Sequence, residues 1–215
     1  MGESGKIFFA DREILSDAVT FYYTDYEPES IFVAEYGSNI IGYLIGCKDT
    51  RWYYQIWRIK ILPKIIAKTI LRGTVFNIKT LRFMYHSIIS CIRRDFKRPD
   101  IYKKYPAHFH INIDKDYRDM GIGTRLVGYF LEYLKNRQVK GVHVVTISEK
   151  AKEFFKKNGF DLIYSRKINT LSYLLKSDIL LYILARKCYF VNSIKPNFLI
   201  ENYYCSIIST ERKAR

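Results

Sequence analysis

The chain has 215 residues and a formal net charge of +15, with 36 Lys and Arg residues against 21 Asp and Glu residues. This length favours one domain with a substantial core, and the hydrophobic share of 48% is ordinary for a globular protein. The four cysteines form no C-x-x-C pair, which argues against a disulfide framework or a zinc site and predicts reduced thiols in a cytoplasmic protein. Neither a signal peptide nor a membrane-spanning run is recognisable, so we expect a soluble or at most peripheral protein.

The first fifty residues predict a strand, a helix and a hairpin. Residues 6–10 form a short apolar run, and Asp11 is suited to cap the helix whose apolar residues then recur at helical spacing. Two further apolar runs, 30–36 and 40–47, flank Gly37-Ser38-Asn39, which is a turn-forming sequence. This arrangement is typical of a β-hairpin.

Residues 51–104 are the unusual part of the chain. They contain fourteen basic residues and two acidic ones, and fourteen minus two gives +12, most of the formal charge of the whole chain. Their apolar residues recur at a spacing that predicts two or three amphipathic helices. Pro63 should kink or restart the first helix, and Gly73 should separate the next. We interpret this segment as a basic, aromatic helical insertion.

A glycine-rich turn, Arg118-Asp119-Met120-Gly121-Ile122-Gly123-Thr124, follows an alternating strand that carries His108 to Ile113 and opens a periodic helix. A strand, a tight turn and a helix N-terminus together make an anion site, because unpaired N–H groups and the helix dipole point outward. The two glycines lack a Cβ, so the backbone can bend and a phosphate can approach. Leu126 stands where a dinucleotide fingerprint needs its third glycine, and the Lys-Ser/Thr pair of a P-loop is missing. A glycine turn that binds nothing is the alternative.

The pattern R-x-x-G-x-G-T after a strand resembles the pyrophosphate loop of the GNAT acyl-CoA N-acetyltransferase superfamily. Residues 141–147 read as a buried strand, and the following A-K-E-F-F-K-K-N-G-F at 151–160 is similar to the family's A-x-x-F-Y-x-x-x-G-F signature. Gly159 would end that helix as a C′ residue. The resemblance covers about residues 6–188, and its specific motifs lie in 108–160.

The resemblance implies an α/β fold with a mixed, mostly antiparallel central sheet, flanked by helices and interrupted by the insertion. We expect a GNAT-like domain over 1–188, in which Leu162 to Ser165 and Ile179 to Ala185 are strands, the second suited to closing the sheet. Residues 189–215 would be a C-terminal extension that packs on the domain, mediates a homodimer or frays.

The same resemblance implies acetyl-CoA as cofactor and acetyl transfer to a primary amine by direct attack. The backbone of Ile111 and Ile113 would hold the pantetheine arm, and residues 118–124 would hold the pyrophosphate. The residues expected at the cofactor are Ile111, Asn112, Ile113, Arg118, Asp119, Met120, Gly121, Ile122, Gly123, Thr124, Ser148 and Phe155.

Amine acetylation needs a base, because an ammonium is not nucleophilic. His108, His110 and Asn112 share one face of their strand, and histidine has a suitable unperturbed pKa. We predict His110 as the base, with Asp114 and Glu35 behind it. A hydrogen-bonded core or cleft-wall role for His110 is the alternative. Two histidines on one strand with no identified third ligand predict no metal site.

Two positions depart from the family pattern. Phe155 stands where many members have a tyrosine that protonates the departing thiolate, so water or another residue such as Tyr164 would serve. Ser148 stands where asparagine is frequent and offers one donor instead of two. Both changes weaken the expectation of catalysis more than that of cofactor binding. A non-catalytic acyl-CoA-binding module, or a protein that binds an anionic surface, is therefore the alternative.

The acceptor stays open between small-molecule and peptide amines. The basic insertion could cover the acceptor cleft and select an acidic substrate, or contact anionic lipid or nucleic acid through its Lys/Arg face. It could also be a helical hairpin with a solvated basic outer face. No nucleic-acid-reading motif is present, so nucleic acid is the least expected of these partners.

Overall fold

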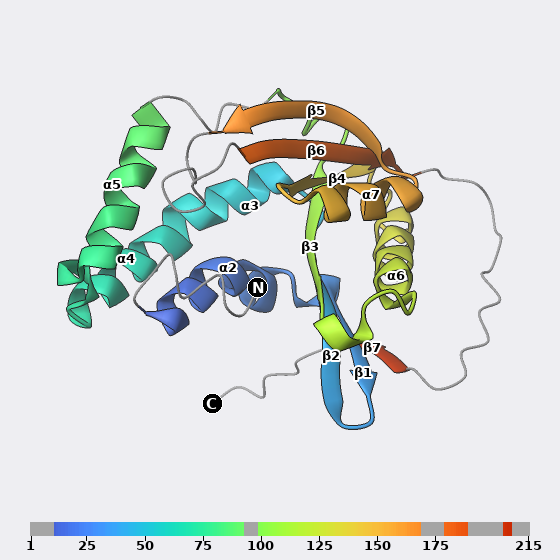
Figure 1. Cartoon of the computed structure of the whole chain (residues 1–215), viewed down its shortest axis with the longest axis horizontal. Coiled ribbons are helices and arrows are strands. Elements are labelled where there is room, and N and C mark those ends of the chain that lie inside the picture. The colour runs from blue at the N-terminus through green and yellow to red at the C-terminus, as the bar shows by residue number, and fades with distance from the viewer. Residues whose placement is uncertain (1–10, 93–98, 169–178, 189–203, 208–215) are drawn as a thin grey trace.

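The computed structural model describes residues 11–92, 99–168, 179–188 and 204–207. These residues form a seven-stranded sheet with helices on both faces (Figure 1). Neighbouring strands are antiparallel except for one parallel pair, which confirms the predicted mixed sheet. The strand predicted at residues 6–10 lies outside the described residues. Within the described ranges, no helix is long and apolar enough to cross a membrane.

The sheet has the order β5-β6-β4-β3-β2-β1-β7. Its strands are β1 (Ile31–Tyr36), β2 (Asn39–Cys47), β3 (Ala107–Ile113), β4 (Gly141–Thr146), β5 (Asp161–Ile168), β6 (Ile179–Lys187) and β7 (Tyr204–Ile207). The α-helices are α2 (Arg12–Tyr26), α3 (Thr50–Ile56), α4 (Leu62–Leu71), α5 (Ile78–Ile92), α6 (Ile122–Asn136) and α7 (Glu149–Lys157). Short helical turns are η1 (Pro28–Ser30), η2 (Trp57–Ile61), η3 (Thr74–Phe76) and η4 (Lys115–Tyr117).

The first helix and the hairpin form as their local sequence predicts. The carboxylate of Asp11 accepts hydrogen bonds from the backbone N–H groups of Glu13 and Ile14, which satisfies two donors at the start of α2. Strands β1 and β2 pair antiparallel up to Tyr36 and Asn39, and Gly37 between them has a positive φ of 60°. Glycine adopts this turn conformation without the strain that a Cβ would add.

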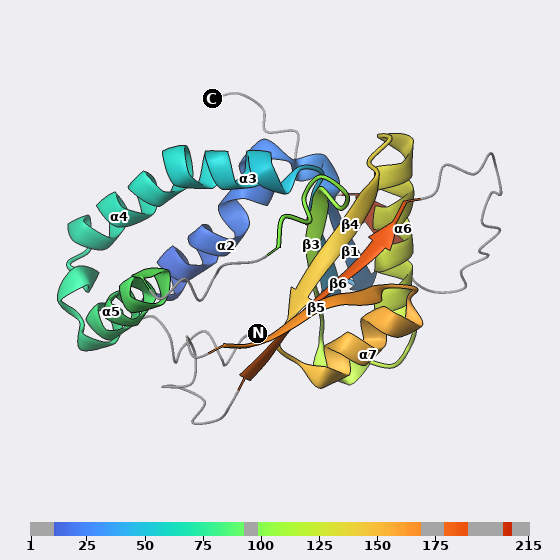
Figure 2. The ribbon, with the colours of Figure 1, turned by 90° about the horizontal axis from the view of Figure 1, so that it is seen from above.

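The insertion folds as a succession of helices that extends away from the sheet (Figure 2). Trp57–Ile61 is wound as a π-helix that continues into α4, and Pro63 lies in the first turn of α4. Gly73 separates α4 from η3 with a φ of 66°. Both predicted interruptions are confirmed. We call residues 57–92 the helical arm.

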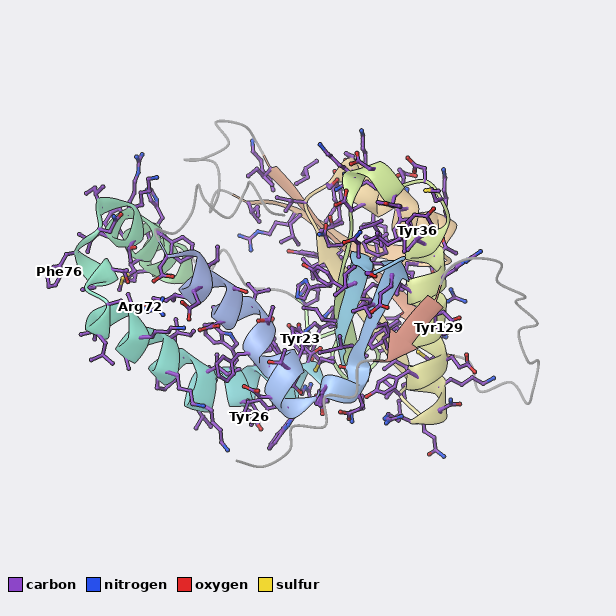
Figure 3. The ribbon with its side chains drawn as sticks, turned by 90° about the horizontal axis from the view of Figure 1, so that it is seen from below. Tyr23, Tyr26, Tyr36, Arg72, Phe76 and Tyr129 are labelled. Carbon is purple, nitrogen blue, oxygen red and sulfur yellow. The ribbon has the colours of Figure 1, made fainter. Side chains whose placement is uncertain are left out.

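The arm is attached to α2 by ion pairs. Lys68 Nζ contacts carboxylate oxygens of Glu13 at 2.7 Å and Asp17 at 2.5 Å. Arg72 contacts Asp11 at 3.0 Å and Glu13 at 2.7 Å, and its side chain points between the helices in Figure 3. Acidic residues of α2 therefore neutralise two of the basic residues that we considered for recognising an acidic substrate.

Two apolar clusters hold helices against opposite faces of the sheet. Helix α6 buries Leu126, Phe130 and Leu134 against one face, as its amphipathic pattern requires. On the other face, α2, α3 and the π-helical turn pack against β2. Their buried residues in this cluster are Tyr22, Tyr23, Ile45, Cys47, Ile56 and Ile61.

The two ends of the sheet differ from the simplest expectation. Strand β6 lies between β4 and β5 rather than at an edge. Strand β7, from the segment that we placed beyond the core domain, pairs antiparallel with residues 32–35 of β1. This part of the C-terminal extension therefore joins the sheet of the same chain.

Candidate active site

The sheet divides between β3 and β4. These parallel strands are in register at only two pairs, Ala107 with Val142 and His108 with His143. Beyond that point β3 stays paired with β2 up to Ile113, whereas β4 stays paired with β6. The two strands therefore separate, and each turns one backbone edge towards the space between them.

Backbone direction identifies which residues face this split. The N–H of Asp114 donates to the carbonyl of Ile41 on β2 at 2.8 Å. Because alternate residues of a strand direct their backbone groups to opposite edges, Asn112 and His110 also face β2. The N–H and C=O groups of Ile111 and Ile113 therefore face the split, at the two positions predicted to contact the pantetheine arm.

The glycine turn lies at the open end of the split. Arg118 Nε donates to the carbonyl of Ile113 at 3.1 Å, which fixes the start of the turn to the end of β3. Helix α6 begins at Ile122, within the glycine-rich turn and not after it. Gly121 is its N-cap residue and has no side chain, so no side chain accepts from the first-turn N–H groups.

This uncapped N-terminus contrasts with those of two other helices. Asp11 caps α2, and Ser148 Oγ accepts from Ala151 N at 3.3 Å at the start of α7. The 15 residues of α6 align their peptide dipoles, and its first turn contains no acidic residue. Arg118, the first residue of the turn, adds a positive charge, so the arrangement fits a bound anion.

Different constraints favour glycine at the two glycine positions of the turn. Gly121 has a φ of 76°, and a Cβ there would meet nothing within 4 Å. A Cβ on Gly123 would lie only 3.0 Å from Cζ of Phe154, on α7. The expected close approach of a phosphate does not explain glycine at position 123, because a side chain there would meet the neighbouring helix.

His110 presents an accessible ring beside an aromatic group. Its ring centroid lies 6.1 Å from that of Tyr23 and 6.0 Å from that of His108. His110 is exposed to solvent, so a ligand can reach it. The protein atoms around its ring still desolvate the charged form, which lowers the pKa of His110 below its ordinary value of 6.5. His110 is therefore neutral, and able to accept a proton, at pH 7.

His108 has a structural role. It is buried, with Nε2 2.9 Å from Tyr23 Oη and Nδ1 2.8 Å from Thr50 Oγ1. His143, its partner at the last register pair, is also buried and contacts the carbonyl of Tyr105 through Nδ1 at 2.8 Å. Among the described residues, no group of three His, Cys, Asp or Glu side chains is arranged to hold a metal ion.

The two carboxylates considered behind His110 lie elsewhere. Asp114 is exposed at the end of β3, and its carboxylate accepts from the N–H of Asp116 at 3.1 Å. His110 on β3 pairs with Ile45 on β2, which in turn pairs with Ile31 on β1. Glu35 lies on β1, four residues further along the strand than Ile31. The structure therefore does not bring His110, Asp114 and Glu35 together.

The residues that depart from the family pattern take clear structural positions. Ser148 is exposed and caps α7. Phe155 is 6% exposed, with ring centroids 5.8 Å from Phe109 and 5.7 Å from Phe160, so it belongs to the core beneath β3. Tyr164, considered as a replacement acid, is on β5, which is separated from β4 by β6.

Sequence reasoning missed Tyr23 and Thr50, the two hydrogen-bond partners of His108. They are 85 and 58 residues away from it along the chain, and neither belongs to a recognisable motif. The helical periodicity of α2 identifies Tyr23 at most as a residue near the core. Its contact with the strand beside the split exists only in the folded chain.

Comparisons with known proteins agree with this arrangement. The sequence model of the Acetyltransferase (GNAT) domain family matches residues 85–162, which contain β3, the glycine turn, α6, β4 and α7. Among solved structures, the crystal structure of SsHAT is 22% identical, with a TM-score of 0.59 over 86% of this chain and 85% of that chain. This similarity shows a shared fold.

Two further structures are similar at a lower level. One, from Bacillus anthracis str. Ames, is a protein proposed to be a streptothricin acetyltransferase, in complex with acetyl coenzyme A. It is 18% identical over 77% of this chain and 68% of that chain, with a TM-score of 0.46. An agmatine N-acetyltransferase mutant is 17% identical over 83% and 80%, with a TM-score of 0.47. No curated protein sequence matches the chain.

Proposed function

We propose that the chain is a member of the GNAT superfamily and an N-acetyltransferase that moves an acetyl group from acetyl-CoA to a primary amine; the partial family match and the shared fold support this proposal. The fold supports acetyl transfer in general. The observation that carries the proposal is the split between β3 and β4, which leads directly to the uncapped N-terminus of α6. A GNAT-like protein without this opening would have no place for an extended acyl carrier.

The residues around the split fit acetyl-CoA. The backbone groups of Ile111 and Ile113 suit the amides of a pantetheine arm, which needs hydrogen-bond donors and acceptors along an extended chain. The N–H groups of Ile122, Gly123 and Thr124 suit the pyrophosphate. When bound, acetyl-CoA supplies a thioester whose carbonyl carbon is open to attack by an amine.

His110 is our proposed general base. Its lowered pKa keeps the ring neutral at pH 7, so it can take a proton from an ammonium directly or through a water molecule. It lies on β3 next to Ile111, whose backbone faces the split. A primary amine of a small molecule or a peptide is the acceptor class that this chemistry requires.

The buried position of Phe155 favours a second candidate. No hydroxyl is available at that position to protonate a departing thiolate, and Phe155 packs against Phe109 and Phe160 instead. A non-catalytic protein that binds acyl-CoA in the same split would not need such a donor. The two candidates share the cofactor site and differ only in turnover.

Thermal unfolding with and without acetyl-CoA tests the cofactor site. A ligand at 100 times its dissociation constant should add about 2.7 kcal/mol to the free energy of unfolding. Thr124→Glu is the informative variant, because a carboxylate in the first turn of α6 favours the helix dipole but repels a phosphate. Thr124→Gln has the same shape without the charge and serves as the matched control.

We expect acetyl-CoA to stabilise the parent and Thr124→Gln, and to have a much smaller effect on Thr124→Glu. Release of the free CoA thiol is then measured with a panel of primary amines. Turnover with any amine favours the enzyme, whereas stabilisation without turnover favours the binding module. No stabilisation of the parent at millimolar acetyl-CoA would exclude both.

A further inference from the structure

The outer end of the helical arm exposes large apolar side chains. Leu71 is 86% exposed, Phe76 is 84% exposed and Ile78 is 75% exposed. They lie around the turn between α4 and α5, and Phe76 points outward at the end of the arm farthest from the sheet (Figure 3). Three side chains of this size at one projecting turn are costly in water, which indicates an interaction site.

Helix α5 continues this apolar surface. Ile78, Leu81, Tyr85 and Ile88 recur at spacings of three and four, so they share one face of the helix. Their exposed fractions run from 46% to 75%. A surface helix of a globular domain normally turns such a face towards the core. Here the apolar face of α5 is turned to solvent.

The charged residues of the arm itself are all basic. The sequence from Arg51 to Ile92 contains eight basic residues and no acidic residue. The acids of α2 and Asp100 pair with Lys68, Arg72 and Arg51. Five more of these eight basic residues lie on the arm, as do the exposed apolar side chains. They are Arg58, Lys60, Lys64, Lys79 and Arg82.

We propose that the arm docks on the surface of a bilayer that contains anionic lipid, with Leu71, Phe76 and Ile78 inserted among the acyl chains. A bilayer surface satisfies both properties of the arm, because its interior accepts apolar side chains and its headgroups attract Lys and Arg. This inference goes beyond the proposed acetyl transfer and does not depend on it.

Two other occupants fit these observations less well. A second copy of the chain would bring two basic arms together without an acid on either arm, and like charges would oppose the contact. A nucleic acid would attract the basic residues through its phosphates but would leave Leu71 and Phe76 in water. Of these three occupants, a lipid surface best accounts for apolar side chains at the most projecting positions.

Vesicle co-sedimentation of the full chain tests the proposal. Vesicles of phosphatidylcholine are compared with vesicles that also contain phosphatidylglycerol, at low and high salt. The variant Leu71→Ser/Phe76→Ser removes two nearly fully exposed apolar residues, so the fold should be unaffected. Its matched control is Ile40→Ser/Leu162→Ser, at exposed apolar positions of β2 and β5 away from the arm. Lys79→Gln tests the charge.

We expect the parent and the control to bind only the anionic vesicles, and less at high salt. Leu71→Ser/Phe76→Ser should bind roughly tenfold more weakly or worse, and Lys79→Gln about fivefold more weakly. Equal binding by the parent and Leu71→Ser/Phe76→Ser would overturn the proposal. So would a parent dimer that Leu71→Ser/Phe76→Ser converts to a monomer, or binding to nucleic acid but not to vesicles.

Discussion

Tyr23 Oη and Nε2 of His108 form a buried hydrogen bond of 2.9 Å. On the other side of the ring, Nδ1 lies 2.8 Å from Thr50 Oγ1, which also contacts the carbonyl of Pro106 at 2.6 Å. Both ring nitrogens of His108 therefore have a hydroxyl partner. His108 thus joins α2, α3 and β3 at the point where the split begins.

Replacing Tyr23 with Phe should destabilise the protein. The change removes the hydroxyl partner of Nε2 and leaves a buried ring nitrogen without that hydrogen bond, which should cost about 1–3 kcal/mol. Urea denaturation measures the loss. Tyr26→Phe, on the same helix, is the control, because the Tyr26 hydroxyl has no hydrogen bond among the described residues. Equal stability of the two variants would contradict a stabilising role for the hydrogen bond between Tyr23 and His108.

His110→Gln should separate the two candidate functions. If His110 is the base, acetyl-CoA should still stabilise the variant, while kcat falls by about 10²–10⁴. The kcat/KM of the parent should decline only at a pH below 6.5, because desolvation lowers the pKa of His110 in the folded protein. Unchanged turnover in His110→Gln would remove this residue from the mechanism.

The same group should make stability depend on pH. A histidine whose folded pKa lies below the ordinary 6.5 binds fewer protons when folded than when unfolded. Its contribution is therefore complete above pH 6.5 and is lost as the pH falls through the folded pKa. Measuring the free energy of unfolding from pH 7 to pH 5 should show a smaller decline in His110→Gln than in the parent.

Glu27 should show the opposite pH dependence. It is 3% exposed and accepts from Tyr22 Oη at 3.0 Å and from the N–H of Lys48 at 2.9 Å. Burial raises its pKa above the ordinary 4.5, so the folded state binds more protons and stability falls as the pH rises above 4.5.

Two substitutions of Glu27 distinguish its charge from its hydrogen bonds. Glu27→Gln should remove the fall in stability as the pH rises above 4.5 and keep one acceptor oxygen. Glu27→Ala should cost on the order of 3 kcal/mol, because buried donors lose their partner. Denaturant titrations at pH 5 and pH 7, made in the His110→Gln background so that His110 does not contribute, would check both. A fall in stability with rising pH that persists after Glu27→Gln would assign it to another group.

The two glycines of the turn should respond differently to alanine. Gly121→Ala should cost about 1–2 kcal/mol through its positive φ. Gly123→Ala should be destabilised by contact with the Phe154 ring. Adding Phe154→Leu should therefore recover stability in Gly123→Ala but not in Gly121→Ala. Recovery in both, measured by thermal unfolding, would contradict the separate roles.

Much of the fold follows from local signals in the sequence. Asp11, Pro63 and Gly73 mark helix boundaries through properties of their own backbone or side chain, and the structure has boundaries there. The apolar runs at 30–36, 40–47 and 141–147 coincide closely with β1, β2 and β4, whereas the mixed sheet that they join was implied by the family resemblance and is confirmed. The start of α6 at Ile122 reflects Gly121, which serves as N-cap without a capping side chain.

The surroundings of the candidate site could not be predicted in this way. Whether Gly123 faces a ligand or Phe154 depends on how α7 packs against α6. The pairing of Lys68 with Asp17 depends on two helices 51 residues apart in sequence. The separation of Glu35 from His110 depends on strand order. Each is a long-range relation that no local pattern encodes.

The two-pair contact between β3 and β4 joins two sections of the sheet through few backbone hydrogen bonds. Strands β7, β1, β2 and β3 form one section, and β4, β6 and β5 form the other. Local opening energies vary within a fold, and amide hydrogen exchange reports them by segment. An elongated ligand bound along both strand edges would add hydrogen bonds between the sections, so its binding should slow amide exchange on both sides of the split.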